Sequence, residues 1–464
     1  MTFSPLDSAL VGPLFATDHM RAVFSDRARI AAMLRMEAAL ARAEARFGLV
    51  PETLASAIEA IEPDDLDPAA IGTQTLLAGV PTIPFLEAVQ QRLPKELEPA
   101  FHKGATTQDI ADTALVLQMR DAFDLVAGDL DAILDGLAEL AGDHRVTPCV
   151  GRTYGQHAAP LTFGYKVAVW ATGIGEVAGQ LHWLRERALV ASLGGPVGTL
   201  AGLGEKGPAI ADAFASELGL GVTPIAWHTL RARMVETGVW LATLMGALAK
   251  MATDVAHLAS TEVGEVVEPY VPGRGGSSAM PHKRNPVSAT VILSAHMAAK
   301  GHVTTLLGAM AAAHERPAGA WHAEWHALPQ LFGLASGSLR EARGLAEGLV
   351  VDAERMRRNI DATRGLLFAD AVAARLAPSL GRERTHRLIE QAADKVRTSR
   401  SSLQDVLRTD PDFSRDAPAD IVAAAFDLSP ATAAAAAWVD RALPELTRIR
   451  ERLRSTTVTS ERRS

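Results

Sequence analysis

Apolar residues recur along two long stretches of the chain with alternating steps of three and four, the spacing of a heptad seam on one helix face. The first seam is Val116, Met119, Phe123, Val126, Leu130, Ile133, Leu137 and Leu140, and the second is Leu241, Leu244, Leu248, Met251, Val255 and Leu258. At about 1.5 Å per residue, the segment 113–142 predicts a rod of about 45 Å. Neither rod can bury its seam alone, so the pattern predicts a bundle of long helices.

A first unit is predicted upstream of these rods. Ser25 and Asp26 precede an apolar-periodic run at 30–47, and Gly48 follows it, so the run has the start and stop signals of a helix. Proline and acidic residues then punctuate residues 51–100, which indicates short helices joined by turns. Alternation typical of strands is scarce along the whole chain.

The pattern therefore predicts an all-α fold with three helical domains. We expect an N-terminal helical domain at 1–111, a central long-helix bundle at 112–354 with further helices at 287–313 and 328–349, and a C-terminal helical domain at 355–464. The polar end of the chain, residues 455–464, is expected to be disordered.

Composition narrows the class of protein. With 464 residues, 48% hydrophobic and 22% charged, the chain can bury a large core. Its net charge of -8 offers no overall attraction to nucleic acid or to an anionic membrane. The single cysteine, Cys149, excludes disulfides within the chain and is expected to be a small core residue. No signal peptide and no run of about 20 apolar residues is evident, so we expect a cytoplasmic protein without membrane segments.

The stretch 273–286, GRGGSSAMPHKRNP, interrupts the helical pattern. Its glycines and prolines disfavour helix and strand, so it is expected to be a loop. A flexible connector would explain the glycines and serines, but it would not explain Ser277, Lys283 and Asn285, which a tight turn could gather around one anionic group. Lysine stabilises an alkoxide or a carboxylate, and asparagine with loop amides stabilises a developing enolate oxygen. The loop is therefore a candidate catalytic element.

Two other segments concentrate polar side chains just before predicted helices. In FHKGATTQDIADTA, residues 101–114, Thr107 or Asp109 is expected to cap a helix, and because helix starts also bind anions, this cap is compatible with a carboxylate site. In GRTYGQHAAPLTFG, residues 151–164, the polar side chains fit either a functional site or a polar loop that satisfies its own backbone.

The loop sequence GSSAMPHKRNP resembles the signature loop of the fumarase/aspartase superfamily, whose members add to, or eliminate from, a carbon next to a carboxylate. The resemblance extends to the opening helix and to the segments 192–204, 227–236 and 314–331. It implies that residues 101–114 and 151–164 form the rest of the active site. The implied catalytic residues are Ser277, Lys283 and Asn285, and the implied substrate-binding residues are His102, Thr106, Thr107, Arg152, Thr153, Tyr154, Gln156, His157, Ser278, Met280 and Arg316.

The chain departs from the superfamily pattern at two positions. Hydratases and lyases of the superfamily commonly have a histidine where Tyr154 stands, and a glutamate thirteen positions after the serine, where this chain has Thr290. A carboxylate can attack or leave without being protonated, so a reaction that adds an internal carboxylate tolerates the loss of this acid pair. One branch of the superfamily, the 3-carboxy-cis,cis-muconate cycloisomerases, carries out this chemistry, and segment 314–331 resembles that branch.

This branch implies a cycloisomerase that closes a tricarboxylic diene to a muconolactone, in aromatic-compound catabolism through protocatechuate degradation and the beta-ketoadipate pathway. It also implies a homotetramer in which each active site is built from three chains, with a small polycarboxylate substrate and neither cofactor nor metal. Either Ser277 or Lys283 could transfer the proton. His322 and His326 lie four apart, but we interpret them, with Glu324, as packing or polar-network residues, because no further ligand run is nearby.

Other functions stay open. A related lyase could release fumarate, or a similar unsaturated acid, from a substituted succinate with Tyr154 as the acid. Expulsion of a nitrogen leaving group, as in adenylosuccinate or argininosuccinate lyases, is disfavoured by the missing histidine and glutamate. A non-enzymatic helical scaffold, like the lens crystallins among these proteins, would predict a disrupted Ser277 loop, and the loop is intact.

Overall fold

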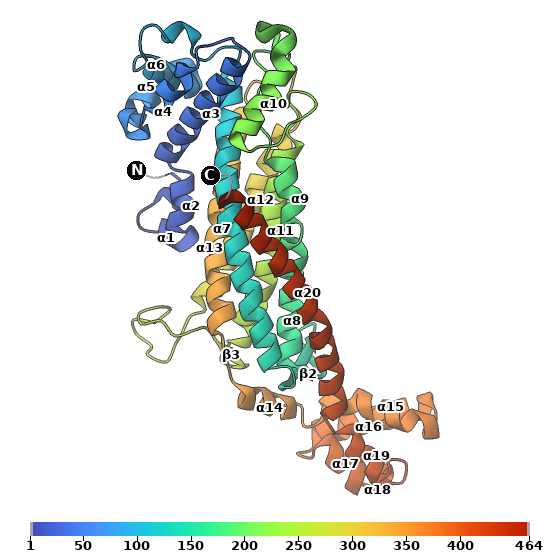
Figure 1. Cartoon of the computed structure of the whole chain (residues 1–464). Helices are drawn as coiled ribbons and strands as arrows, with labels where there is room; N and C mark the ends of the chain where they lie inside the picture. The colour runs from blue at the N-terminus through green and yellow to red at the C-terminus, as the bar shows by residue number, and fades with distance from the viewer. Residues whose placement is uncertain (1–2, 462–464) are drawn as a thin grey trace.

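The computed structural model describes residues 3–461, and its long helices lie side by side in an elongated bundle (Figure 1). The bundle consists of α7 (Thr107–Asp143), α8 (Phe163–Ala178), α9 (Leu181–Ala188), α11 (Ala232–Leu258), α12 (Val287–Ala309), α13 (Ala320–Gly348) and the returning helix α20 (Ser429–Glu461). The all-α prediction is confirmed.

Both heptad seams face the interior of this bundle. Every residue of the second seam is buried, and so is every residue of the first except Leu140, which is half-buried. Helix α7 is longer than expected, because it starts at Thr107 rather than at residue 113. Its 37 residues make a rod of about 55 Å.

The N-terminal unit packs beside one end of α7 (Figure 1). It contains α1 (Gly12–Phe15), α2 (Asp18–Val23), α3 (Asp26–Arg46), α4 (Thr53–Glu59), α5 (Pro68–Ala78) and α6 (Thr82–Gln90). As predicted, the Ser25 hydroxyl caps α3 by accepting a hydrogen bond from the Ala28 amide at 3.2 Å. Gly48 follows α3 with a left-handed φ of 73°, which suits a helix stop.

The remaining helices are α10 (Gly207–Leu218) beside α3, α14 (Ala353–Asp361), and the small group α15 (Ala369–Leu380), α16 (Arg382–Thr398), α17 (Leu403–Thr409), α18 (Pro411–Ser414) and α19 (Ala419–Ala425). The small group has its own hydrophobic core, separate from that of the bundle. Strands are short: β1 (Pro148–Thr153) pairs antiparallel with β2 (Gln156–Thr162), and β3 (Val266–Val267) with β4 (Val350–Val351).

Helix α20 leaves the small C-terminal group and packs on α7 and α8. Arg450 and Arg454, one turn apart, each donate from Nε to the Asp131 carboxylate at 2.9 Å. The helix continues to Glu461, so the predicted disorder of residues 455–461 is wrong. Once the helix is anchored on α7, each further residue adds a hydrogen bond without a new nucleation cost. The end of the predicted tail, 462–464, lies outside the described residues.

A fully buried ion cluster joins the start of α11 to α7 and α13. Arg231 donates to Asp112 at 2.7 Å and to Glu324 at 2.8 Å, and the Trp321 indole donates to Asp112 at 3.0 Å. Burial disfavours a charge on Arg231, but the two carboxylates outweigh it and raise its pKa. Burial also raises the pKa of Glu324, although Arg231 opposes the rise. The interpretation of Glu324 as a polar-network residue is therefore confirmed.

Two stretches, Ala232–Leu258 and Ala419–Ser455, are long and apolar enough to cross a membrane by length and composition alone. Half of the apolar window of the first is buried inside the bundle, as in the core helix of a soluble protein. The second is not one helix, because it spans the break between α19 and α20. Two such stretches are weak evidence for a membrane segment. The expectation that the protein has no membrane segment stays a prediction.

Replacing Arg231 by methionine tests the buried cluster. The change leaves Asp112 and Glu324 buried without their counter-charge, so we expect it to lower the free energy of unfolding by roughly 3–5 kcal/mol. Urea unfolding followed by circular dichroism measures the loss. The control is Arg27→Met, which breaks the exposed pair with Asp64 and should change little. Equal losses in the two variants would contradict a structural role for the cluster.

Candidate functional site

The predicted catalytic loop links β3 to α12 and projects from the side of the bundle (Figure 1). Its tip is a tight turn, as expected. The Ser277 Oγ accepts a hydrogen bond from the Met280 amide at 3.2 Å, and the Lys283 amide donates to the Met280 carbonyl at 3.0 Å. Ser277 is half-buried, whereas Lys283 and Asn285 are exposed, as are Ser278 and Met280. Hydroxyl, ammonium and amide therefore share one accessible turn.

A glycine closes the neck of this loop. The Asn285 amide donates to the Gly275 carbonyl at 2.9 Å, and Gly275 has a left-handed φ of 67°. A Cβ at this position would lie only 2.6 Å from the Asn285 carbonyl oxygen. A side chain at residue 275 would therefore push apart the two arms that hold the turn.

The base of the loop is tied to the bundle. The Glu268 carboxylate accepts from the Ser288 amide at 3.0 Å and from the Ala289 amide at 2.9 Å, which caps the start of α12. The Ser288 hydroxyl donates to Glu341 of α13 at 2.8 Å, and Arg274 forms an ion pair with the same carboxylate. The loop thus has a fixed base and an exposed tip.

A hollow of about 800 Å³ lies between this loop and the end of α11. Three cationic side chains, Arg274, Lys283 and Arg284, line it together with His282. Asn285 and one acidic residue, Glu268, also line the hollow. This excess of positive charge suits a ligand with several carboxylates.

The second predicted segment forms the start of α7. The Thr106 amide donates to Asp109 at 3.0 Å, so Thr106, rather than Thr107, occupies the cap position, while Asp109 plays its expected part. Arg316 donates to the Thr106 and Thr107 hydroxyls, each at 2.9 Å. Arg316 itself is exposed. The structure therefore joins a guanidinium and two hydroxyls at a helix N-terminus, a combination that binds carboxylates.

Asp109 also connects the start of α7 to other parts of the chain. Its carboxylate accepts from the Gly194 and Gly195 amides at 2.9 Å each, and it lies 2.6 Å from His228 Nε2. Sequence reasoning left His228 unassigned, because its partner is 119 positions earlier and no local pattern marks the pair. We interpret His228 as a residue that positions Asp109.

The third predicted segment is a β-hairpin that leads directly into α8, so its place before a helix is confirmed, but the hairpin itself was not predicted. Tyr154 and Gly155 form its two-residue turn with φ of 51° and 75°, as in a type I′ turn. Tyr154 is fully exposed, and the flanking Thr153 and Gln156 are also exposed. The local signal was missed because such turns usually contain asparagine or glycine rather than tyrosine.

One of the predicted ligands in this hairpin, Arg152, has structural partners. Arg152 donates twice to the buried Glu265 carboxylate, at 3.1 and 2.6 Å, and Asn359 donates to the same group at 2.8 Å. Arg152 therefore fastens the hairpin to the segment before β3. His157 pairs with Arg152 across the hairpin and is half-buried, and its pKa is lowered by burial and then by the charge of Arg152.

His102, predicted to bind substrate, also has a fixed partner. Its Nδ1 lies 2.9 Å from Oε1 of Glu37 on α3, and the Glu37 side chain is buried. The residue lies in the connector that leads into Thr106, so it is close to the carboxylate site in sequence.

The three polar segments do not meet within one chain. Thr107 begins α7 and the hairpin follows its end, so the rod of about 55 Å lies between them. Figure 1 shows the 268–286 loop projecting from the bundle, away from the N-terminal end of α7. A site that uses all three segments needs more than one chain.

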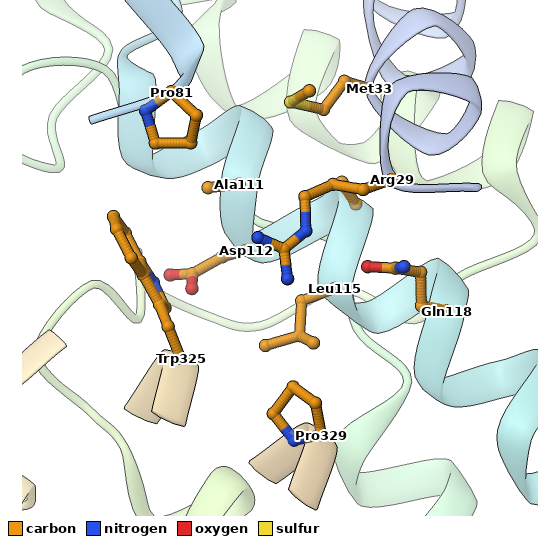
Figure 2. A pocket seen from close by; sticks show the side chains of 10 residues that line it. Arg29, Met33, Pro81, Ala111, Asp112, Leu115, Gln118, Trp325 and Pro329 are labelled. Carbon is orange, nitrogen blue, oxygen red and sulfur yellow. The ribbon is translucent and has the colours of Figure 1, made fainter. Parts of the chain in front are cut away.

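Figure 2 shows a small cavity between α3, α7 and α13, with Arg29, Leu115, Gln118 and Trp325 around it. Its volume of about 30 Å³ is room for a single water molecule. A polycarboxylate cannot enter it, so it is not a substrate site.

The histidines of α13 are not arranged as metal ligands. The His322 ring lies 4.6 Å from the Trp325 ring, which confirms its packing role, and His326 is exposed. Within residues 3–461, no group of three or more His, Cys, Asp or Glu side chains could hold a metal ion. Cys149 is buried, and burial raises its pKa to about 12, so the prediction of a core residue is confirmed.

Comparisons with known proteins cover almost the whole chain. The family model described as "Lyase" matches residues 14–301, and the model described as "Adenylosuccinate lyase C-terminus" matches residues 365–442. The chain is 46% identical to the 3-carboxy-cis,cis-muconate cycloisomerase of Pseudomonas aeruginosa, over 93% of this chain and 95% of that one. It is 42% identical to the nitrosuccinate lyase of Streptomyces davaonensis, over 94% of this chain and 95% of that one.

A solved structure agrees with these similarities. The crystal structure of the 3-carboxy-cis,cis-muconate lactonizing enzyme from Pseudomonas putida superposes with a TM-score of 0.90 at 44% sequence identity. The match covers 94% of this chain and 98% of that one.

Proposed function

The chain belongs to the lyase family, and on that premise we propose that it is a cycloisomerase that closes 3-carboxy-cis,cis-muconate to a carboxymuconolactone. The observation that carries the proposal is similarity along nearly the full length to proteins of that activity, combined with an intact Ser277 loop. The basic hollow beside the loop supports a substrate with several carboxylates. The fold of the lactonizing enzyme is the same.

The proposed reaction uses hydroxyls and cations rather than a metal or cofactor. Thr106, Thr107 and Arg316 hold one substrate carboxylate at the start of α7. A second carboxylate attacks a carbon of the conjugated diene, which forms a C–O bond and moves the electron pair toward the neighbouring carboxyl group. Lys283, Asn285 and loop amides stabilise the resulting enediolate.

A proton then adds to the carbon next to that carboxyl group, which completes the lactone. Ser277 is the proposed donor, and in the reverse direction the base, with Lys283 stabilising its alkoxide. Lys283 itself is the alternative donor. No acid is needed for the ring-closing oxygen, because a carboxylate attacks in its ionised form. The exposed Tyr154, which stands where the superfamily has a histidine, is consistent with this reaction.

We also propose a homotetramer with active sites shared between chains. The separation of the polar segments along α7 supports this proposal. The outer face of α12 supports it too: Lys300 is the only Asp, Glu, Lys or Arg in the helix, while Met297 is 68% exposed and Leu307 52%. An apolar face of this kind on a long helix suits burial against another copy of the chain.

The reaction is tested by following the ultraviolet absorbance of 3-carboxy-cis,cis-muconate with purified protein. We expect the diene band to disappear and a lactone to form. Substituted succinates, nitrosuccinate among them, are assayed in parallel for release of fumarate. An unchanged diene band, together with fumarate from one of these compounds, would contradict the cycloisomerase and favour the alternative lyase.

The assembly is tested by measuring molecular mass in solution. The wild-type chain of 49.1 kDa should run as a tetramer, and Met297→Glu should shift it to smaller species, because a carboxylate would be buried in the interface. Leu76→Glu is the matched control, since it places the same charge on an equally apolar side chain of α5 that is 86% exposed. A wild-type monomer, or a tetramer that tolerates Met297→Glu, would contradict the proposed interface.

A further inference from the structure

Two buried carboxyl groups on α3 have no part in the proposed chemistry. Glu37 and Glu44 are each 1% exposed, and their separation of seven residues puts them on one face of the helix. Glu37 is bonded to His102, whereas Oε1 of Glu44 is buried and has no hydrogen-bond partner among the described residues. A second buried carboxyl group beside an existing ion pair needs an explanation, because burial of an unpaired anion is costly.

The chain from His102 to Thr106 has little freedom. His102 has a left-handed φ of 55°, which is uncommon for a residue other than glycine, and Gly104 has a φ of 74°. A Cβ at Gly104 would lie 2.6 Å from the Leu203 side chain, so this residue is pressed against its neighbour. Thr106 follows His102 by four residues, and Thr107 by five. A displacement of His102 would therefore be passed to the hydroxyls that Arg316 contacts.

Burial couples the charges of this cluster. Burial raises the pKa of Glu44 to about 8, and the charge of Glu37 adds to the rise, while Lys103 and His102 oppose it. Burial lowers the pKa of His102, but the charge of Glu37 and its hydrogen bond outweigh this effect, so the net shift is upward. Because burial raises the pKa of Glu44 to about 8, its carboxyl group is neutral at pH 7.

Charged side chains also occur on the elements that pack on α3. Arg42 pairs with Glu59 of α4, Arg46 pairs with Glu217 of α10, and Lys206 donates to the Phe47 carbonyl. On the side of α7, Asp109 acts on His102 and is itself held by the Gly194 and Gly195 amides. The Lys103 ammonium donates to the Leu49 carbonyl at 3.2 Å. Most of these groups thus have partners of their own.

We propose that Glu44 is a positioning residue for the Thr106–Thr107–Arg316 site, acting through Glu37 and His102. While Glu44 is protonated, His102 stays against Glu37, and the connector holds the two hydroxyls in place. When Glu44 loses its proton, a second anion competes with Glu37 for His102 and Lys103, and the connector shifts. The inference rests on the proposed function only in that Thr106 and Thr107 hold a substrate carboxylate.

The kinetic test measures KM and kcat between pH 6 and 9.5. The account predicts that the KM of the wild-type protein rises several-fold above about pH 8 while kcat changes little, because binding is affected rather than chemistry. Glu44→Gln should remove the rise. Glu37→Gln removes a charge that raises the pKa of Glu44, so this pKa should be lower in the variant. The KM of Glu37→Gln should therefore begin to rise at a lower pH than that of the wild type. The matched control, Glu139→Gln at an exposed position of α7, should behave as the wild type.

A second test needs no substrate. The pKa of Glu44 in the folded state lies above its ordinary value of 4.5, so between these values the folded state binds more protons than the unfolded one. Stability is therefore lost as pH rises from about 4.5 to about 8, and the loss is complete above about 8. The melting temperature of Glu44→Gln should fall less than that of the wild type between pH 5 and 9. Glu139→Gln should follow the wild type.

The two tests separate the possible failures. If the melting temperatures of Glu44→Gln and of the wild type fall by the same amount between pH 5 and 9, Glu44 does not titrate in this range. That result would overturn the inference. If the melting curves differ but KM stays flat above pH 8, the cluster titrates without positioning the site, which also overturns it. If the lactone assay fails, calorimetric binding of propane-1,2,3-tricarboxylate replaces KM, and the same pH dependence is expected of its Kd.

Discussion

Helix α7 sets the geometry of the whole molecule. It is 37 residues long and buried along one seam, so it behaves as a rigid rod of about 55 Å, against which the other long helices lie (Figure 1). A rod cannot fold back, so the threonines at its start stay far from the hairpin at its end. Because α7 is long and rigid, a site that uses both of its ends has to be assembled from more than one chain.

The first two turns of α7 carry two buried carboxylates, Asp109 and Asp112. Asp109 is satisfied by two glycine amides and by His228, and Asp112 by Arg231 and Trp321. These partners come from three other parts of the chain, which are thereby fixed around one helix end. Buried charges that are fully paired in this way specify one arrangement, whereas an unpaired charge would be costly. The precise placement of Thr106 and Thr107 depends on these pairs.

Much of this fold could be predicted because its signals are local. The seams follow from spacing, the cap at Ser25 from one side chain, and the Ser277 turn from its glycines and prolines. The contacts of Arg316 with Thr106, and of Arg152 with Glu265, could not be predicted, because each joins residues more than a hundred positions apart. The hairpin was missed because a tyrosine holds a left-handed turn position, and the helix beyond residue 455 because its anchor lies on α7.

The shared site is the central claim, and a hybrid assembly tests it most directly. Ser277→Ala removes the proposed proton donor, and Thr107→Val removes a carboxylate ligand at the far end of the molecule. Each variant alone should be nearly inactive. When the two are dissociated in mild denaturant and reassociated together, mixed assemblies contain some sites with both intact segments, so the account predicts that activity returns. If the mixture stays as inactive as its parents, while wild-type protein recovers from the same treatment, the sites are not shared between chains.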